Sequence, residues 1–283
     1  MTTDESHRPG GIGMKTKWLA MCGLAATLFV TACGNSASNG DGSKEGQTAQ
    51  GAQQTVKVAT TSDGPPFVYL NPDNNKMEGL VIDILEDIAK RENLKLDYQV
   101  MNWEAMIPSL KGGKADIIAE GMYITDERKQ VINFTNPYFG YGEGLMVQGD
   151  DTSTKSLDDL KGKKVGALIG TSYQTMLEEK GKSLGIEMKV YQQFGDMMKD
   201  VDNKRLDAAL FDQPILVYMK KQNPALTYRV VEDYKPSLPG EIGFGVTKSK
   251  QDVLDKLNAG IDEIKKDGTL KKIYEKWGLD WKF

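Results

Sequence analysis

The sequence predicts an α/β fold built from two similar lobes. Two observations predict it: short apolar strands alternate with amphipathic helices from Thr55 onward, and a second series of the same kind begins at Lys164. Such alternation is typical of sheets whose strands are joined by crossover helices. A length of 283 residues and a hydrophobic content of 39% provide enough apolar material for two cores.

The first series is indicated by its hydrophobic spacing. Leu80, Ile84 and Ile88 recur every four residues and therefore share one face of a helix. A short apolar strand at 56–58 precedes them. The elements after them are an alternating strand at 96–100, a helix marked by Trp103, Ile107 and Leu110, and a buried strand at 115–119.

The second series repeats this order. Its elements are a strand at 165–169, a helix that opens at Tyr173, a strand at 187–191, a helix at 196–204 and a strand at 207–211. In both series a polar turn leads to an aspartate before the last strand, Asp116 in the first and Asp207 in the second. Aspartate commonly bonds its own backbone in such turns, so we interpret both residues as structural.

The end of the chain predicts how the two lobes are connected. A strand at 242–246 and two apolar-faced helices after it are too short for a third lobe, so we expect them to pack on the first. Lobe 1 would then comprise 55–145 and 242–283, and lobe 2 would comprise 146–241. Two crossover strands, near 144–148 and 238–243, would form a hinge that permits closure.

The composition excludes several classes of function. The single histidine is His7, and the two cysteines are Cys22 and Cys33, so all three precede the predicted lobes. The body therefore cannot build a Ser-His-Asp or Cys-His nucleophile, a Cys/His zinc site or a disulfide. We expect no metal and no cofactor. A formal net charge of −4 makes nucleic acid an unsuitable partner, and we expect a monomer.

The N-terminus has the pattern of a signal peptide over residues 1–32. A basic stretch begins at Met14, which we expect to be the true initiator, and an apolar run from Trp18 to Ala32 follows it. The run ends in VTACG, which resembles a lipobox with Cys33 as the lipidated residue; the alternative is an ordinary signal peptide with another cleavage site. Residues 33–54 are rich in small polar residues and predict a flexible linker. This predicts an extracytoplasmic protein, lipid-anchored at the outer face of the cytoplasmic membrane in the Gram-positive manner.

Several segments of the body occur together in a characteristic order. They are PPF at 65–67, EGLVID at 78–83, WEAMIPSL at 103–110, GMYITDER at 121–128, FTNPY at 134–138 and KDGTL at 266–270. In this combination the chain resembles the polar amino-acid-binding proteins of bacterial ABC importers, solute-binding protein family 3. The resemblance implies the two-lobed, type II periplasmic-binding-protein fold. It also implies a substrate-binding protein that holds an amino acid between its lobes and delivers it to the permease subunits.

The same resemblance assigns residues to the two charged ends of an amino acid. Arg128 matches the arginine that clamps the carboxylate, and Asp212 matches the aspartate that receives the ammonium. The remaining head-group positions are the helix start at Thr171 and Ser172 and the backbone of Gly121 and Tyr123. From the residue pattern alone, Arg128 would be a solvated helix residue. Thr171 could be an ordinary N-cap, a role compatible with binding the ligand. For Asp212 the alternative is a loop carboxylate.

The residues that would surround the ligand side chain predict a polar or cationic amino acid. Trp103 matches an aromatic that packs on the ligand, whereas Gly64 stands where many relatives carry a second aromatic. Thr61 replaces an aspartate common in binders of basic amino acids. Glu120 stands where a small hydroxyl residue is usual and adds negative charge, so a cation over Trp103 would be stable near it. Glu120 could instead turn to solvent.

Two other functions stay open. A dehydratase-like enzyme on the same fold would use Glu120 as a general acid, because burial can raise the pKa of a carboxyl group. A ligand-sensing module of a receptor would normally continue into a transmembrane helix; the residues up to Phe283 show no such segment after the predicted lobes, and we expect a stand-alone binding protein. We expect Asp212 to bind a free ammonium and the protein not to be an enzyme.

Overall fold

The computed structural model describes residues 53–279. The predicted signal peptide, Met14 as initiator, the lipidated Cys33 and nearly all of the linker lie outside the described residues. Among the helices that are described, none combines the length and apolar character that a membrane span requires.

The first sheet has the strand order β5-β1-β6-β15-β7. β1 pairs in parallel with β5 and β6, while β15 runs antiparallel to β6 and β7. We call the half of the molecule built on this sheet lobe 1. Its strands are β1 (Gln54–Thr60), β5 (Leu94–Val100), β6 (Ile117–Ile118), β7 (Asn133–Phe134) and β15 (Gly245–Val246). A small three-stranded sheet joins β2 (Asp63–Gly64), β3 (Val68–Asn71) and β4 (Lys76–Glu78).

The second sheet, β11-β10-β12-β9-β13, has the same pattern of directions. β10 is parallel to β11 and β12, and β9 is antiparallel to β12 and β13. We call this half lobe 2. Its strands are β9 (Glu143–Val147), β10 (Lys164–Leu168), β11 (Glu187–Tyr191), β12 (Ala208–Asp212) and β13 (Arg229–Val230). The repeated order of elements in the sequence is therefore a repeated sheet, and the predicted two-lobed α/β fold is confirmed.

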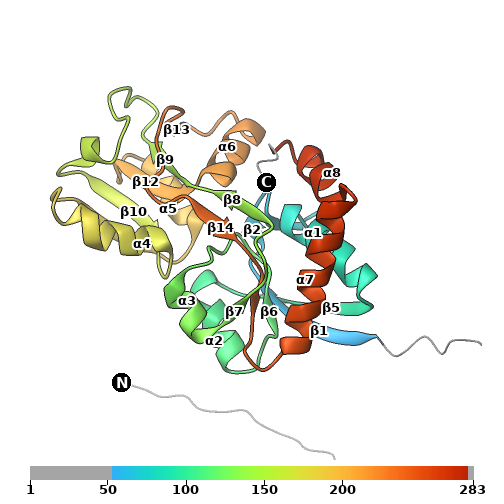
Figure 1. The fold of residues 1–283 in the computed structure, drawn as a ribbon. Coiled ribbons are helices and arrows are strands. Elements are labelled where there is room, and N and C mark those ends of the chain that lie inside the picture. The colour runs from blue at the N-terminus through green and yellow to red at the C-terminus, as the bar shows by residue number, and fades with distance from the viewer. Residues whose placement is uncertain (1–52, 280–283) are drawn as a thin grey trace, which may run out of the picture. The chain divides into compact units, whose positions relative to one another are not determined.

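Helices cover both sheets. In lobe 1 they are α1 (Leu80–Arg91), α2 (Met106–Lys111) after a short 3-10 turn (Trp103–Ala105), α3 (Asp126–Val131), α7 (Gln251–Lys266) and α8 (Thr269–Lys276). In lobe 2 they are a 3-10 turn (Asp158–Leu160), α4 (Ser172–Met176) with a π-helical turn after it (Leu177–Gly181), α5 (Phe194–Asp202) and α6 (Gln213–Gln222). The C-terminal helices α7 and α8 pack beside α1, as expected from the sequence (Figure 1).

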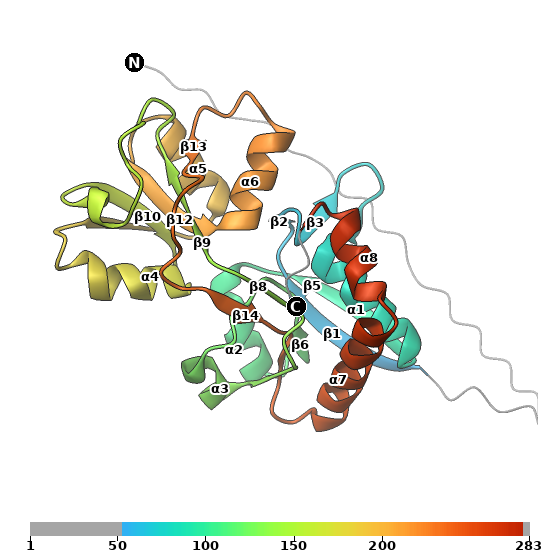
Figure 2. The same cartoon turned by 45° about the horizontal axis from the view of Figure 1, so that its top comes forward.

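Two strands run side by side between the lobes. β8 (Phe139–Tyr141) pairs antiparallel with β14 (Gly240–Ile242), and both views show them between the two main sheets (Figures 1 and 2). The first crossing predicted near 144–148 is therefore wrong in place, because residues 143–147 already form β9 within lobe 2. Both segments are apolar, and apolar periodicity cannot distinguish a connecting strand from a sheet strand.

The predicted strand at 242–246 is also divided. β14 ends at Ile242, and β15 begins at Gly245 in a different sheet. The break falls at Gly243, where an added Cβ would lie 2.9 Å from Ile124 Cδ1 and 3.1 Å from the carbonyl oxygen of Thr135. The chain passes so close to lobe 1 at this point that only a residue without a side chain fits.

The two aspartates of the repeated turn have equivalent structural roles. Asp116 Oδ2 accepts from the backbone N–H of Lys57 at 2.9 Å, and Asp207 Oδ2 accepts from that of Lys164 at 2.7 Å. Each carboxylate thus bonds the backbone of the neighbouring strand rather than its own turn. Neither residue lines the cavity described below, so their structural interpretation is confirmed, with a different partner from the one expected.

Candidate functional site

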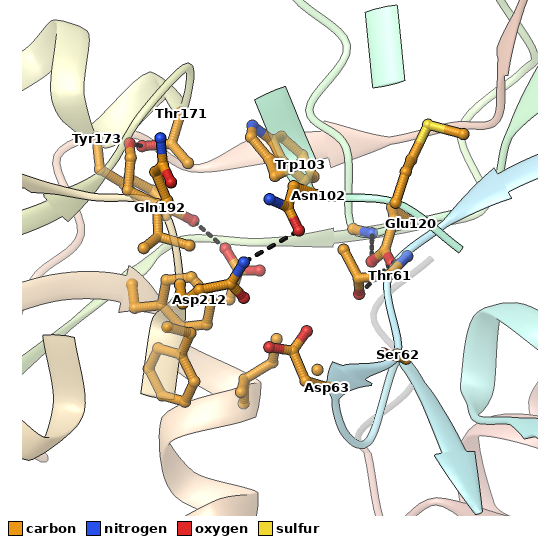
Figure 3. A pocket seen from close by; sticks show the side chains of 18 of the residues that line it. Thr61, Ser62, Asp63, Asn102, Trp103, Glu120, Thr171, Tyr173, Gln192 and Asp212 are labelled. Carbon is orange, nitrogen blue, oxygen red and sulfur yellow. Dashed lines mark hydrogen bonds between the residues drawn. The ribbon is translucent and has the colours of Figure 1, made fainter. Parts of the chain in front are cut away.

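A cavity of about 230 Å³ lies between the two lobes and is lined by residues of both (Figure 3). This volume is below the roughly 300–1,000 Å³ of sites that hold drug-sized ligands, so it suits a smaller solute. The cavity lies beyond the carboxyl ends of six strands, β1, β5, β6, β10, β11 and β12, each of which ends at a lining residue or is followed by one within two positions. Open α/β sheets place their ligands at this edge.

Arg128 is positioned by the start of α3. Thr125 caps this helix by accepting from the backbone N–H of Arg128 at 3.2 Å. Only 9% of Arg128 is exposed, and its Nη1 donates to the carbonyl of Tyr123 at 2.9 Å. Burial lowers the pKa of Arg128, but a guanidinium keeps its proton in proteins. Arg128 thus presents a buried, permanent positive charge to the cavity.

Trp103 and Arg128 both reach across to lobe 2. Trp103 Nε1 donates to the carbonyl of Gly170 at 3.1 Å, and Arg128 Nη2 donates to the same oxygen at 3.3 Å. The Arg128 guanidinium carbon lies 5.5 Å from the centroid of the Trp103 ring. The cation that the structure places over the Trp103 ring is therefore Arg128 of the protein, whereas the sequence led us to expect a cation of the ligand there. Gly170 adopts a left-handed φ of +72°, which lets the turn after β10 present its carbonyl to lobe 1.

Thr171 and Ser172 lie where α4 begins. Thr171 Oγ1 accepts from the backbone N–H of Gln174 at 3.3 Å and donates to the carbonyl of Leu168 at 2.7 Å. Thr171 therefore acts as an N-cap. Both residues also line the cavity, so capping is compatible with the predicted seat for a carboxylate.

Asp212 ends β12 and occupies the N-cap position of α6, but its side chain makes no capping hydrogen bond. Its carboxylate accepts a hydrogen bond from Tyr173 Oη. Burial raises the pKa of Asp212 to about 6, against the lowering effect of hydrogen bonds from Tyr173 and Tyr141 and of the charge on Arg128. A carboxylate so deprived of water would gain strongly from a cation in the cavity.

Three tyrosines gather around Asp212, and sequence reasoning missed the contribution of their side chains. Tyr173 Oη, which donates its proton to Asp212, also lies 3.1 Å from Tyr123 Oη, while Tyr141 Oη donates to the carbonyl of Gly121 at 2.7 Å. A backbone carbonyl and an N–H of Gly121 and Tyr123 are predicted to contact a ligand; the carbonyls of both residues already accept hydrogen bonds within the protein. No local motif identifies Tyr141, because it comes from the connecting strand β8.

Glu120 and Thr61 lie together in the cavity wall. Glu120 is 6% exposed, and its Oε1 accepts from Thr61 N at 2.7 Å, Thr61 Oγ1 at 2.6 Å and Thr60 Oγ1 at 3.3 Å. Its Oε2 accepts from the backbone N–H of Gly121 at 3.4 Å. Glu120 does not turn to solvent. Despite these donors, burial raises the pKa of Glu120 to about 7.

This shift predicts a pH dependence of stability. An unfolded glutamate titrates near ~4.3, so between that value and the pKa of about 7 the folded protein binds more protons than the unfolded chain. The free energy of unfolding therefore falls as the pH rises through this range. On going from pH 8 to pH 5, the free energy of unfolding of ligand-free wild-type protein should rise by about 2–3 kcal/mol more than that of Glu120→Gln. Urea unfolding of both proteins at each pH measures this difference; parallel pH profiles would contradict it.

Other lining residues had no predicted role. Gln193 Nε2 from lobe 2 donates to Asn102 Oδ1 of lobe 1 at 3.0 Å, and Asp63 lines the cavity from β2. Together with the bonds at Gly170 and Tyr173, the Asn102 contact closes the cleft by direct hydrogen bonds between the lobes. Within residues 53–279, no group of three or more His, Cys, Asp or Glu side chains is arranged to hold a metal ion.

Comparisons with known proteins agree with this geometry. A family model described as bacterial extracellular solute-binding proteins, family 3, matches residues 56–280. The chain is 34% identical to the probable amino-acid-binding protein YxeM of Bacillus subtilis (strain 168), over 92% of this chain and 94% of the relative. An ancestral arginine-binding protein bound to arginine is similar with a TM-score of 0.74 at 36% identity, over 80% of this chain and 99% of that one. An ancestral arginine-binding protein bound to glutamine is similar with a TM-score of 0.73 at 35% identity, over 79% of this chain and 97% of that one.

Proposed function

We infer the function of this chain from its family: it belongs to the bacterial extracellular solute-binding proteins, family 3. We propose that it captures a polar or cationic amino acid outside the cytoplasmic membrane and delivers it to the permease of an ABC importer. The observation that carries this proposal is one cavity with a buried guanidinium from lobe 1, Arg128, and a buried carboxylate from lobe 2, Asp212. An amino acid carries the complementary charges, a carboxylate and an ammonium group, both attached to its α-carbon.

The two ends of the ligand would be neutralised by opposite lobes. Arg128 pairs with the α-carboxylate, for which a guanidinium offers a bidentate fork, and the helix start at Thr171 and Ser172 supplies further donors. Asp212 receives the α-ammonium, which takes the place of Tyr173 Oη or shares the carboxylate with it. Gly121 and Tyr123 line the head-group end. Because each lobe satisfies only one charge, the complete set of contacts exists only when the lobes are closed.

Ligand binding would therefore shift the protein toward closure. A ligand moves a conformational equilibrium only by its difference in affinity for the two states. Here that difference is the set of contacts with Asp212 and α4, which an open cleft would withhold from a ligand held by Arg128. The closed form is the state that a permease would receive.

We further propose that the ligand is released unchanged. The relatives are named as binding proteins. The four hydrogen bonds that Glu120 accepts are as compatible with a structural role as with a role as general acid. Assays with prephenate and arogenate as substrates should detect no product. The proposal also includes the signal peptide, the lipid anchor at Cys33, the monomeric state and the permease partner. Its lobe limits are 55–145 with 242–283 for lobe 1 and 146–241 for lobe 2.

The requirement for both charges of the ligand tests the proposal. For the amino acid that binds best in a calorimetric screen, we expect its analogue without the α-ammonium to bind at least about a hundredfold more weakly. The analogue leaves Asp212 buried without a cation, and breaking a buried pair costs about 3–5 kcal/mol. An analogue with a blocked carboxylate should bind more weakly by a similar factor, because Arg128 then lacks its anionic partner. If both analogues bind as well as the parent, or no amino acid binds, the proposal is wrong.

A further inference from the structure

The charges that line the cavity do not balance once an amino-acid head group is bound. Its charged lining residues are Asp63, Glu120, Arg128 and Asp212, three acids and one base. Under the proposed function, on which this inference rests, the ligand's carboxylate neutralises Arg128 and its ammonium neutralises Asp212. Asp63 and Glu120 stay without a cation. Burial raises the pKa of Glu120 to about 7, so this residue can hold its proton when the cleft closes, whereas Asp63 is the carboxylate left to pair with a cationic group of the ligand.

Glu120 is already stabilised by the protein. Three donors from Thr60 and Thr61 converge on its Oε1, and the Gly121 N–H approaches its Oε2. A carboxylate can be held by such hydrogen bonds without a counter-ion. Its remaining capacity to accept bonds from a ligand is therefore small on Oε1, and its place in the wall is fixed by β1.

Asp63 differs from Glu120 in having no partner of this kind. Within residues 53–279 its side chain takes part in no ion pair and accepts no hydrogen bond from another residue, and its carboxylate points into the cavity (Figure 3). The residue as a whole is solvent-exposed, so it lies at the open edge of the cavity. Partial burial of the carboxyl group nevertheless raises the pKa of Asp63. The Asp63 carboxylate oxygens are therefore free to accept hydrogen bonds from a ligand in the cavity.

The surroundings of Asp63 leave room for a long side chain. The next residue is Gly64, and a Cβ placed there would meet nothing closer than Ile215 Cδ1 at 3.5 Å. Val100, Trp103 and Ile215 line the same cavity with apolar surface. A Lys-like or Arg-like side chain buries its methylene groups along such surface while its charged end reaches a polar rim.

We propose that Asp63 receives a cationic group at the end of the ligand's side chain, so that the preferred ligand is an α-amino acid with an ammonium or guanidinium side chain. This pairing gives the Asp63 carboxylate a counter-ion, and Glu120 keeps its hydrogen bonds. A guanidinium would bind Asp63 best, because its planar pair of N–H donors matches a carboxylate.

Arginine and its neutral analogue citrulline test this assignment. The two differ chiefly at the end of the side chain, so the ratio of their dissociation constants reports on the cation alone. We expect wild-type protein to prefer arginine by about tenfold or more, the range of a hydrogen-bonded charge pair. In Asp63→Asn the preference should fall to near one, through weaker arginine binding, while citrulline affinity changes less than about twofold. Calorimetry of the purified body measures all of these constants.

Two further variants complete the experiment. Asp73→Asn removes the same charge from an exposed position in the turn between β3 and β4, and it should leave the ratio unchanged. Glu120→Gln should change the affinity for arginine and for citrulline by the same factor. The inference is overturned if Asp63→Asn weakens both ligands equally, if Glu120→Gln alone removes the preference, or if wild-type protein binds citrulline or glutamine as tightly as arginine. In these three cases an amino acid still binds, whereas failure of the proposed function would leave no amino-acid binding at all.

Discussion

Arg128→Ala is expected to lower the affinity for the amino-acid ligand by at least about a hundredfold. The substitution leaves the α-carboxylate of the ligand in a closed cleft without its cation, and breaking a buried charge pair costs about 3–5 kcal/mol. It also removes the Arg128 bonds to Tyr123 and to Gly170 of lobe 2. Part of the loss should therefore come from a less stable closed form. Titration calorimetry with wild-type and variant protein measures the effect.

The control for this prediction is the adjacent residue. Lys129→Ala removes a positive charge from the exposed side of the same helix, where the side chain is 55% exposed, and it should leave affinity within about twofold, since exposed pairs contribute little. Arg128→Lys keeps the charge but loses the bidentate fork, so it should fall between wild type and Arg128→Ala. Urea unfolding checks that each variant is folded. A folded Arg128→Ala protein with wild-type affinity would refute the site.

Much of the fold could be predicted from the sequence because its elements are defined by local spacing. The strand at 187–191 has the predicted limits, and the periodic helix marked by Leu80, Ile84 and Ile88 is α1, with all three residues buried. The errors fall between the lobes. Residues 139–147 contain two successive strands, β8 and β9, in different sheets. Their apolar residues, interrupted by glycines and Glu143, carry no periodic signal for where one sheet ends.

The candidate site was predicted unevenly for a related reason. Trp103 and Arg128 stand in recognisable segments, Asp212 and Glu120 follow predicted apolar strands, and all four line one cavity. Tyr141 was missed because its role depends on packing against residues about twenty positions away. The occupation of the Trp103 ring by Arg128 likewise depends on the three-dimensional path of the chain. Residue patterns identify which groups are available, whereas their pairing is decided by tertiary structure.

Glu143→Ala is expected to lower the free energy of unfolding by about 3–5 kcal/mol. Glu143 is fully buried at the start of β9, directly after the first crossing between the lobes. Its carboxylate accepts from Tyr234 Oη at 2.9 Å and from the backbone N–H groups of Ser237 at 2.5 Å and Leu238 at 2.9 Å. Those residues lead into the second crossing, so one side chain fastens both connections to lobe 2. Alanine leaves the buried Tyr234 hydroxyl and the partly buried N–H groups of Ser237 and Leu238 without their acceptor, and such losses add up to this range.

Two comparisons separate this effect from the removal of a charge. Glu143→Gln keeps one acceptor oxygen but turns an amide NH2 toward backbone donors, so it should cost less than alanine, about 1–3 kcal/mol. Glu241→Ala removes an exposed glutamate from the neighbouring strand β14, and it should stay within about 0.5 kcal/mol of wild type. Urea unfolding of ligand-free proteins measures all three. Because both crossings depend on Glu143, a loss below about 1 kcal/mol for Glu143→Ala would mean that the connections are held by the β8 and β14 pairing alone.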